Sequence, residues 1–382
     1  MAFSCQSFFK MLLFSISLSL VWGCSQRPAA FTLHNPLVHG AETGMSWPSP
    51  PDVSRYAYVG QLTGEGNFVD INGSKRNGVV RFFRWLIGMS EQRDIPVILQ
   101  RPQGGMVDEM GRVLVTDVSR HAVYVFDRNS SAPEVWEFVK DGLKFSMPIA
   151  ISGNCSGGYL VSDAVLGLVA VLANDGVGQG LIGEGILKHP TGIAVECHSR
   201  RVYVADRKDN DIKVFSLDSG GLLFSFGGFG EVEGRLNAPT YISLGEGDVS
   251  VTDTLNSRVQ TFDYEGNYVS SFGRRGMFLG DLPRPKGHAR DTDGNIYVVE
   301  SYYDYLLVFN RNGEFLLPIG GSGYELGQFY LPSGVWTDEQ NRIYVADTFN
   351  GRVVIFQYLG EGNEPDVAED DSARSGHDGA GH

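Results

Sequence analysis

The chain has 382 residues, with 31 Lys and Arg against 45 Asp and Glu, and its formal net charge at pH 7 is −14. An acidic chain without a basic stripe cannot replace the counterions around phosphates, so the composition argues against a nucleic-acid partner. The chain is longer than a domain with one ordinary hydrophobic core, but its length suits a fold in which a small core is repeated around an axis.

The N-terminus predicts a secreted protein. Lys10 is the only charged residue before an apolar run from Met11 to Trp22, which is long enough for a signal-peptide core but too short to span a bilayer as a helix. Gly23 and Cys24 follow this run and complete a sequence that resembles a bacterial lipobox.

The lipobox resemblance implies a signal peptide over residues 1–23 and a lipid on Cys24. It places the protein in a bacterial cell envelope, and Ser25 is typical of sorting to the outer membrane, facing the periplasm or the surface. The alternative is an ordinary secretory signal followed by an unmodified cysteine.

Two segments precede the repeated region. Residues 24–52 contain several prolines and are expected to be a tether between the lipid and the folded domain. Residues 53–68 contain an apolar stretch, Tyr56–Leu62, which is predicted to be a strand.

An insertion with a single helix candidate is expected over residues 69–98. Within it, Val79–Met89 has apolar residues at helical spacing. This helix either caps the folded domain or lies on the membrane with Arg81 and Arg84 at the lipid headgroups.

Residues 99–358 contain a repeat with a period of about 46 residues. Each copy begins at a proline, at positions 102, 148, 190, 239, 285 and 332. Each copy also has an acid at the end of its second predicted strand: Asp117, Asp163, Asp206, Asp253, Glu300 and Asp347. Short strands rich in Val, Ile, Tyr and Phe at this even spacing predict an all-β fold, a six-bladed β-propeller with four-stranded blades.

The repeated phrases resemble the NHL repeat. The resemblance is carried by Ile343–Phe356 and Val249–Phe262, and by the linking phrases at Phe226–Gly230 and Phe272–Gly276. It is weak in the second blade, where residues 162–168 lack the Asn-x-Arg pair of the other two phrases. Membership of this family implies an interaction scaffold, although a fold does not fix a function.

The sixth blade is incomplete in its own repeat. After Phe356 the sequence offers no fourth strand, and the predicted strand Tyr56–Leu62 can supply it. An N-terminal strand that completes the last blade closes the ring and removes open sheet edges. Residues 359–382 are strongly acidic and contain few apolar residues, so a disordered tail is expected.

The repeated acids form a ring on one face of the predicted propeller. We name this the loop face, because the loops after the second strands and the loops between blades lie there; the opposite side is the turn face. A ring of six carboxylates could suggest a metal, but acids at strand ends commonly accept backbone N–H bonds in the following turn. The structural interpretation is preferred, and no metal is predicted.

His288 and Arg290 are the candidates for lining the central channel. Some related six-bladed propellers hold a catalytic zinc there through several histidines, and a catalytic zinc needs about three protein ligands. The positions equivalent to His288 in the other blades carry no ligand: Gly105, Ile151, Ile193, Ile242 and Val335. The sequence therefore predicts no catalytic residue and no cofactor.

Cys155 and Cys197 lie seven residues after the prolines of the second and third blades. They should occupy the same turn of neighbouring blades, on the turn face. Equivalent sites in neighbouring blades tend to lie beyond disulfide range, but turns can lean together in an oxidising compartment. Both a disulfide and two free thiols stay open.

The loops of the loop face differ most between blades, and recognition usually resides in such loops. Tyr and Arg are favoured there because they combine a rigid apolar area with a polar tip. The candidate binding residues are Arg120, His121, Lys208, Tyr302, Tyr303, Tyr305 and Phe349. The sequence thus favours a non-catalytic envelope lipoprotein that binds an unidentified protein partner; the alternative is a metal-assisted lyase or hydrolase that uses the channel around His288.

Overall fold

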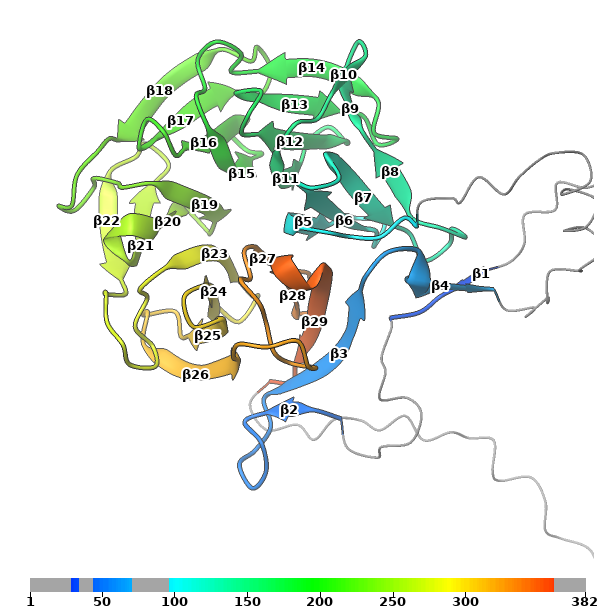
Figure 1. Cartoon of the computed structure of the whole chain (residues 1–382). Coiled ribbons are helices and arrows are strands. Elements are labelled where there is room, and N and C mark those ends of the chain that lie inside the picture. Colours follow the sequence, from blue (N-terminus) through cyan, green and yellow to red (C-terminus); the bar gives the residue numbers. More distant parts are fainter. Residues whose placement is uncertain (1–28, 34–43, 71–95, 361–382) are drawn as a thin grey trace, which may run out of the picture.

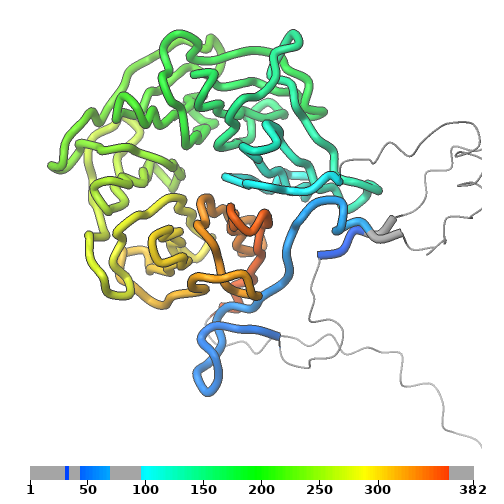
Figure 2. The backbone as a smooth tube through the Cα atoms, viewed as in Figure 1, coloured from blue at the N-terminus to red at the C-terminus, as the bar shows by residue number. Residues whose placement is uncertain are grey.

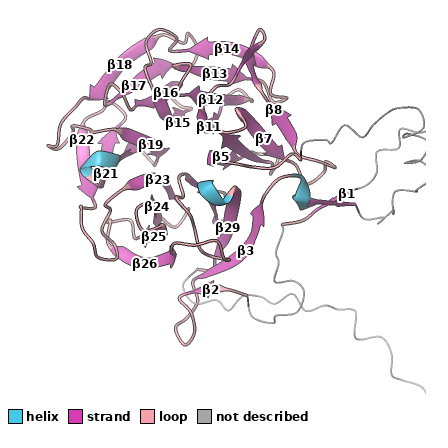
Figure 3. Ribbon diagram, in the orientation of Figure 1, coloured by secondary structure: helices cyan, strands magenta, loops and turns pink. Residues whose placement is uncertain are grey.

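The computed structural model describes residues 29–33, 44–70 and 96–360, and these residues form a ring of six β-sheets around a central axis (Figure 1). The predicted helix at 79–89, the signal peptide and most of the acidic tail lie outside the described residues. Among the described residues, no helix is both long and apolar enough to cross a membrane. Helical structure there consists of short 3-10 turns: Glu65–Asn67, Thr254–Asn256 and Thr348–Asn350 (Figure 3).

The first three blades are four-stranded antiparallel sheets in sequence order. Blade one consists of β5 (Pro102–Val107), β6 (Val113–Asp117), β7 (Ala122–Phe126) and β8 (Glu134–Trp136). Blade two consists of β11 (Pro148–Gly153), β12 (Tyr159–Asp163), β13 (Leu168–Leu172) and β14 (Gly178–Ile182). Blade three consists of β15 (Pro190–Glu196), β16 (Arg201–Asp206), β17 (Asp211–Ser216) and β18 (Leu222–Gly227). A hairpin of β9 (Phe138–Lys140) and β10 (Leu143–Lys144) joins the first two blades.

The last three blades follow the same plan. Blade four consists of β19 (Pro239–Leu244), β20 (Asp248–Asp253), β21 (Arg258–Asp263) and β22 (Tyr268–Phe272). Blade five consists of β23 (Pro285–Arg290), β24 (Ile296–Glu300), β25 (Tyr305–Phe309) and β26 (Phe315–Gly320). Blade six takes β27 (Val335–Thr337), β28 (Arg342–Asp347) and β29 (Arg352–Tyr358) from the C-terminal side of the chain.

An N-terminal strand completes blade six. β3 (Tyr56–Leu62) pairs antiparallel with β29, and β2 (Ser46–Trp47) adds a fifth strand outside it. The N-terminal and C-terminal ends of the folded chain therefore lie side by side (Figure 2). The predicted closure of the ring by Tyr56–Leu62 is confirmed.

Two short strands lie inside the segment that was predicted to be a tether. They are β2 and β1 (Ala29–Phe31), which pairs with β4 (Phe68–Asp70). Phe31 packs edge-on against Phe68 with their ring centroids 5.3 Å apart. The apolar residues of this segment thus add small sheets to the rim, a contact that the prolines alone did not suggest.

The core lies between the blades. The second strands β6, β12 and β24 are buried at every residue, because both faces of each sheet pack against a neighbouring blade. The fourth strands lie at the outer rim and are largely exposed, as in β18 and β22. The short Val- and Tyr-rich strands therefore make their backbone hydrogen bonds within one blade and bury their apolar side chains against the two neighbouring blades.

Candidate functional site

The six repeated acids hold the blades' own backbone. Each is at most 1% exposed. Each accepts an N–H bond from the short segment that precedes the proline of its blade, at 2.6–2.9 Å. Asp117, Asp163, Asp206 and Glu300 also accept N–H bonds from the loop that follows them. The ring is therefore structural, and its carboxylates are engaged before any ligand arrives.

Arginine reinforces two of these acids. Arg258 Nε lies 2.9 Å from Asp253 Oδ2, and Arg352 Nε lies 2.7 Å from Asp347 Oδ2. Burial raises the pKa of Asp253, while hydrogen bonds from the protein act against that rise. The Asn-x-Arg pair of the repeat thus supplies the counter-charge that a buried carboxylate needs.

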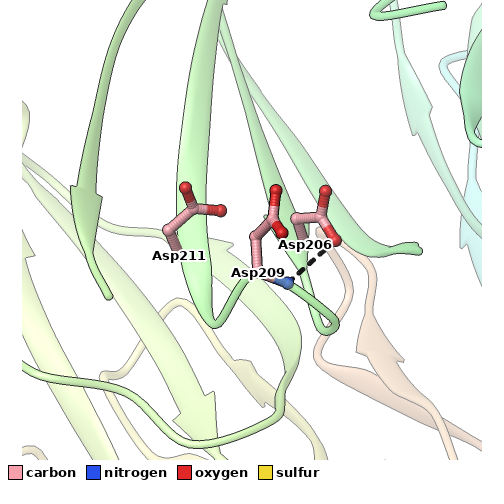
Figure 4. A group of neighbouring side chains, drawn as sticks. All are labelled: Asp206, Asp209 and Asp211. Atoms are coloured by element: carbon pink, nitrogen blue, oxygen red, sulfur yellow. Dashed lines mark hydrogen bonds between the residues drawn. The ribbon is translucent and has the colours of Figure 1, made fainter. Parts of the chain in front are cut away.

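Asp206, Asp209 and Asp211 form the only group of described residues with the spacing of a metal site (Figure 4). Lys213 Nζ lies 3.1, 2.8 and 2.8 Å from their respective carboxylates. Burial lowers the pKa of Lys213, but hydrogen bonds and charges of the carboxylates outweigh this, and the pKa is raised. A protonated lysine therefore occupies the place where a cation would bind.

His288 lies in the channel wall, where it is completely buried. Its Nε2 lies 2.7 Å from Ser243 Oγ and its Nδ1 lies 2.7 Å from Thr252 Oγ1, both in blade four. Burial lowers its pKa to about 3, and the charge of Arg290 contributes to the shift. A neutral imidazole with both nitrogens hydrogen-bonded has no lone pair left for a metal or a substrate.

Arg290 lies at the turn-face end of the channel. Its guanidinium group bonds Asp248 at 2.9 Å and Ser250 Oγ, while its Nε is buried and has no partner among the described residues. It separates a channel cavity of about 290 Å³ from a larger cavity of about 790 Å³ on the turn face.

The larger turn-face cavity is acidic. Its buried aspartates, Asp108, Asp291 and Asp338, each accept a tyrosine hydroxyl bond and backbone N–H bonds within their own turns. Its exposed carboxylates have no hydrogen-bond partner among the described residues: Glu109, Glu246, Asp293 and Glu339. The cavity offers acceptors for polar groups, but the residues that line it include no paired nucleophile and base.

Cys155 and Cys197 are joined by a disulfide, with their Cα atoms 5.5 Å apart. The bond links the first turns of blades two and three. These turns therefore lean together on the turn face. Of the two alternatives that the sequence left open, the disulfide is the one that the structure contains.

The loop face exposes large apolar side chains over blades three to six, and we call this set the apolar arc. Its most exposed members are Met277 (81%), Phe278 (77%), Phe229 (72%), Val232 (71%) and Tyr324 (71%). The remaining members are Leu255, Leu279, Tyr302, Tyr303, Tyr330 and Phe349. They come from three loops between blades and three loops that follow second strands, so several separate segments build one surface.

Contacts join members of the arc from neighbouring loops in two places. Leu279 and Tyr303 line one small cavity between two neighbouring loops. Tyr330 lies 5.5 Å from Tyr324 and 5.6 Å from Phe349, measured between ring centroids.

The predicted binding residues fall into two groups. Tyr302, Tyr303 and Phe349 belong to the apolar arc, and Lys208 is exposed beside it. Three others make contacts inside their own blades or with the next loop. Arg120 Nε bonds the Tyr124 hydroxyl, His121 bonds the Ser146 carbonyl, and Tyr305 packs on the core of blade five.

The loops between blades were missed by the sequence reasoning. Phe229, Met277, Phe278 and Tyr324 follow the Gly-rich phrases that end each fourth strand. The sequence did contain a signal for these residues. They are large apolar residues in loops that otherwise consist of Gly and charged residues, and such loops normally lie at the solvent-exposed surface.

Comparisons with known proteins agree with the fold. A family model described as "6-bladed beta-propeller" matches residues 287–367. "Protein brain tumor" of Drosophila melanogaster is 29% identical over 119 residues, which cover 30% of this chain. The match spans only 11% of the length of that relative, so it concerns a small part of that protein.

Solved structures resemble the whole ring. A structural genomics protein of unknown function from Bacteroides thetaiotaomicron has a TM-score of 0.57 at 12% identity and covers 68% of this chain and 70% of its own. An auxiliary nutrient binding protein from the same organism has a TM-score of 0.53 at 11% identity, with 68% and 69% covered. A streptogramin B lyase has a TM-score of 0.51 at 12% identity, with 68% and 94% covered. At these identities the similarity shows the fold alone, a six-bladed β-propeller.

Proposed function

We propose that this protein is a non-catalytic lipoprotein of a bacterial cell envelope, whose NHL-type propeller binds a partner protein through its loop face. Cys24 carries the lipid, and the protein resides at the outer membrane. The lipobox-like sequence and the NHL-like phrases support the anchor and the repeat type, respectively.

The apolar arc is the observation that carries the binding role. Large exposed apolar patches are uncommon on monomeric proteins and mark sites of interaction. On the turn face, by contrast, the exposed large apolar side chains of the described residues are few, such as Met110 and Val177. Burial of the arc against a partner removes this apolar surface from water, which is the main driving force for association.

The polar groups of the channel and of the acid ring do not favour catalysis. His288 is neutral and bonded at both nitrogens. The ring carboxylates hold backbone N–H groups, and Lys213 lies against all three carboxylates of the Asp206, Asp209 and Asp211 cluster. A general base needs a free lone pair near the reacting proton; His288 offers none, and the ring carboxylates are buried and already accept several hydrogen bonds.

Cross-linking in intact cells tests the binding role. The full chain and a Phe278→Ser/Tyr302→Ser double variant are cross-linked, purified and compared by mass spectrometry. We expect one defined partner with the native chain and at least a tenfold lower yield with the double variant. Leu223→Ser is the control, since Leu223 is 52% exposed on the outer strand β18, away from the arc. Equal capture by the arc variant, or equal loss with the control, would contradict the proposal.

Elemental analysis of the purified chain tests the alternative of a metal-assisted lyase or hydrolase. About one zinc or calcium ion per chain that disappears in His288→Ala would favour that enzyme, because a catalytic zinc requires protein ligands and an open position. A chain with less than about a tenth of an ion favours the scaffold.

A further inference from the structure

Four cationic residues lie at the loop-face ends of blades three and five, beside the starts of the inner strands β15 and β23, and we call them the cationic mouth. Arg207 and Lys208 follow the acid that ends β16 in blade three. Arg284 and Lys286 flank the proline that begins β23 in blade five. Backbone bonds fix three of these positions: Arg207 N–H to the His189 carbonyl, Lys208 N–H to Asp206, and Arg284 N–H to Glu300.

The side chains of the cationic mouth have no hydrogen bond or ion pair with another described residue. Other cations on the same face do. Arg258 bonds Asp253, Arg274 bonds Asp281, and Arg275 bonds the Leu255 carbonyl. The fold therefore uses most basic side chains of this face to hold its loops and leaves these four uncompensated.

Lys286 lies close enough to Arg207 and Arg284 to be affected by their charges. Burial, together with the charges of Arg207 and Arg284, lowers its pKa to about 8. A partly buried cation beside two like charges is unfavourable, and an anion bound among them would remove both costs.

The cationic mouth stands out in a protein whose net charge is −14. Blade four lies between the two halves of the cationic mouth, which belong to blades three and five. The loops that carry Phe229, Leu255 and Met277 belong to or flank blade four, so the arc and the mouth lie on the same part of the loop face. Charge and apolar surface are thus combined on the face to which the proposed function assigns binding.

We infer that the cationic mouth binds the carboxylates of an acidic segment of the partner protein, whose apolar side chains pack on the arc. This inference rests on the proposed function and specifies the chemistry of the partner. The arc exposes the aliphatic Val232, Met277 and Leu279 among its aromatic rings, and such a mixture suits the apolar side chains of a protein segment better than a row of stacked bases. The four cations are also confined to the mouth and form no stripe that could follow a phosphate backbone.

Fluorescence anisotropy with the full chain tests the inference. The probe is a short labelled peptide that repeats Glu-Glu-Phe, and its counterpart repeats Gln-Gln-Phe. We expect the acidic peptide to bind at least about tenfold more tightly than the glutamine peptide at low salt, and to lose that advantage at high salt. The Arg284→Gln/Lys286→Gln variant should weaken binding of the acidic peptide about tenfold.

Arg311→Gln is the matched control, because Arg311 is exposed on the turn face and bonds only the Asp293 carbonyl among the described residues. It should leave the affinity unchanged. Equal affinity for both peptides, an equal loss with the control, or tighter binding of a single-stranded oligonucleotide of similar charge would overturn the inference. Thermal melting keeps the test interpretable, since removal of two like charges should not lower the melting temperature.

The peptide assay and the cross-linking assay fail independently. If the arc variant loses its cellular partner while the acidic peptide shows no preference, the proposed function stands and the acidic segment is wrong. If the arc variant captures the partner as well as the native chain does, the proposed binding by the loop face is wrong.

Discussion

His288 occupies the position at which blades three and four carry Ile193 and Ile242. The other blades fill this place with a small or apolar residue. Blade five fills it with an imidazole that bonds two hydroxyls of blade four. A polar group in the channel wall is tolerated because both of its nitrogens are satisfied, and its neutral state avoids the cost of a buried charge.

The depressed pKa of His288 predicts a loss of stability in acid. Unfolded His288 takes up a proton near its ordinary pKa of 6.5, while the folded residue resists protonation until about pH 3. The unfolded state therefore binds more protons between these values, and the free energy of unfolding falls as the pH falls. We expect this residue to contribute a slope of about 1.4 kcal/mol per pH unit in that window.

His288→Gln isolates this contribution, because its amide can bond the same hydroxyls without titrating. Urea unfolding of both proteins between pH 4 and pH 7 is the measurement, and the native chain should lose stability more steeply. Parallel pH profiles would show that the pKa of His288 is the same in the folded and unfolded states, against the expected depression.

Single residues were predictable from the sequence where their partners are local. The acid ring was correctly interpreted as structural because each acid bonds its own loop and the segment before its own proline. The partners of His288 lie 45 and 36 positions away in another blade, so no spacing reveals them. For the same reason the sequence could not show that Arg207 lies close enough to Lys286 to lower its pKa.

At the level of elements, β3 shows how an N-terminal strand becomes part of a C-terminal blade. Its residues alternate between buried and half-buried, as expected for a strand that packs one face on a core. Leu62 is completely buried and contacts the apolar cluster shared by blades six and one. The closure therefore contributes to the core in addition to pairing an open edge.

Truncation of one side chain in β3 tests this contribution. Leu62→Ala should lower the free energy of unfolding by about 2–5 kcal/mol, because it removes a buried side chain and leaves a cavity. Val59→Ala, at a half-buried position of the same strand, should cost less than about 1.5 kcal/mol. Chemical denaturation measures both, and equal small losses would mean that β3 only covers the blade.

The disulfide marks the limit of element-level prediction. The repeat placed Cys155 and Cys197 in equivalent turns, but blade spacing alone left their distance ambiguous. The 5.5 Å between their Cα atoms depends on how the two turns lean, which is a property of side-chain packing between blades two and three. The loops between blades posed the same difficulty, since the repeat predicts their position but not which side chains reach solvent.

At the scale of the whole molecule, the number of blades and the closed ring followed from the repeat, because each copy is one sheet that needs two neighbours. The rim position of the N-terminal segment did not. β1 pairs with β4, and Phe31 and Leu33 pack on the apolar cluster shared by blades six and one (Figure 1). The first described residue, Ala29, therefore lies at the seam between these blades.

This placement limits how far the propeller can lie from a lipid attached to Cys24. Four residues lie between Cys24 and Ala29, and the five steps of chain from one to the other can extend at most about 18 Å. A lipid-anchored propeller would thus be held to the membrane by its rim, which leaves both the loop face and the turn face accessible to other molecules. The proposed binding role requires this accessibility.

Replacement of the anchoring cysteine tests the arrangement. Cys24→Ser should move the protein from the membrane fraction to the soluble fraction, because lipidation of that residue is the proposed attachment. The melting temperature of the propeller should stay unchanged, since the described residues that form the ring do not include Cys24. Ser25→Ala is the control and should keep the lipid, which intact mass measures directly. A Cys24→Ser chain that remains on the membrane would argue against the lipid anchor and in favour of the alternative in which the apolar face of residues 79–89 lies on the bilayer.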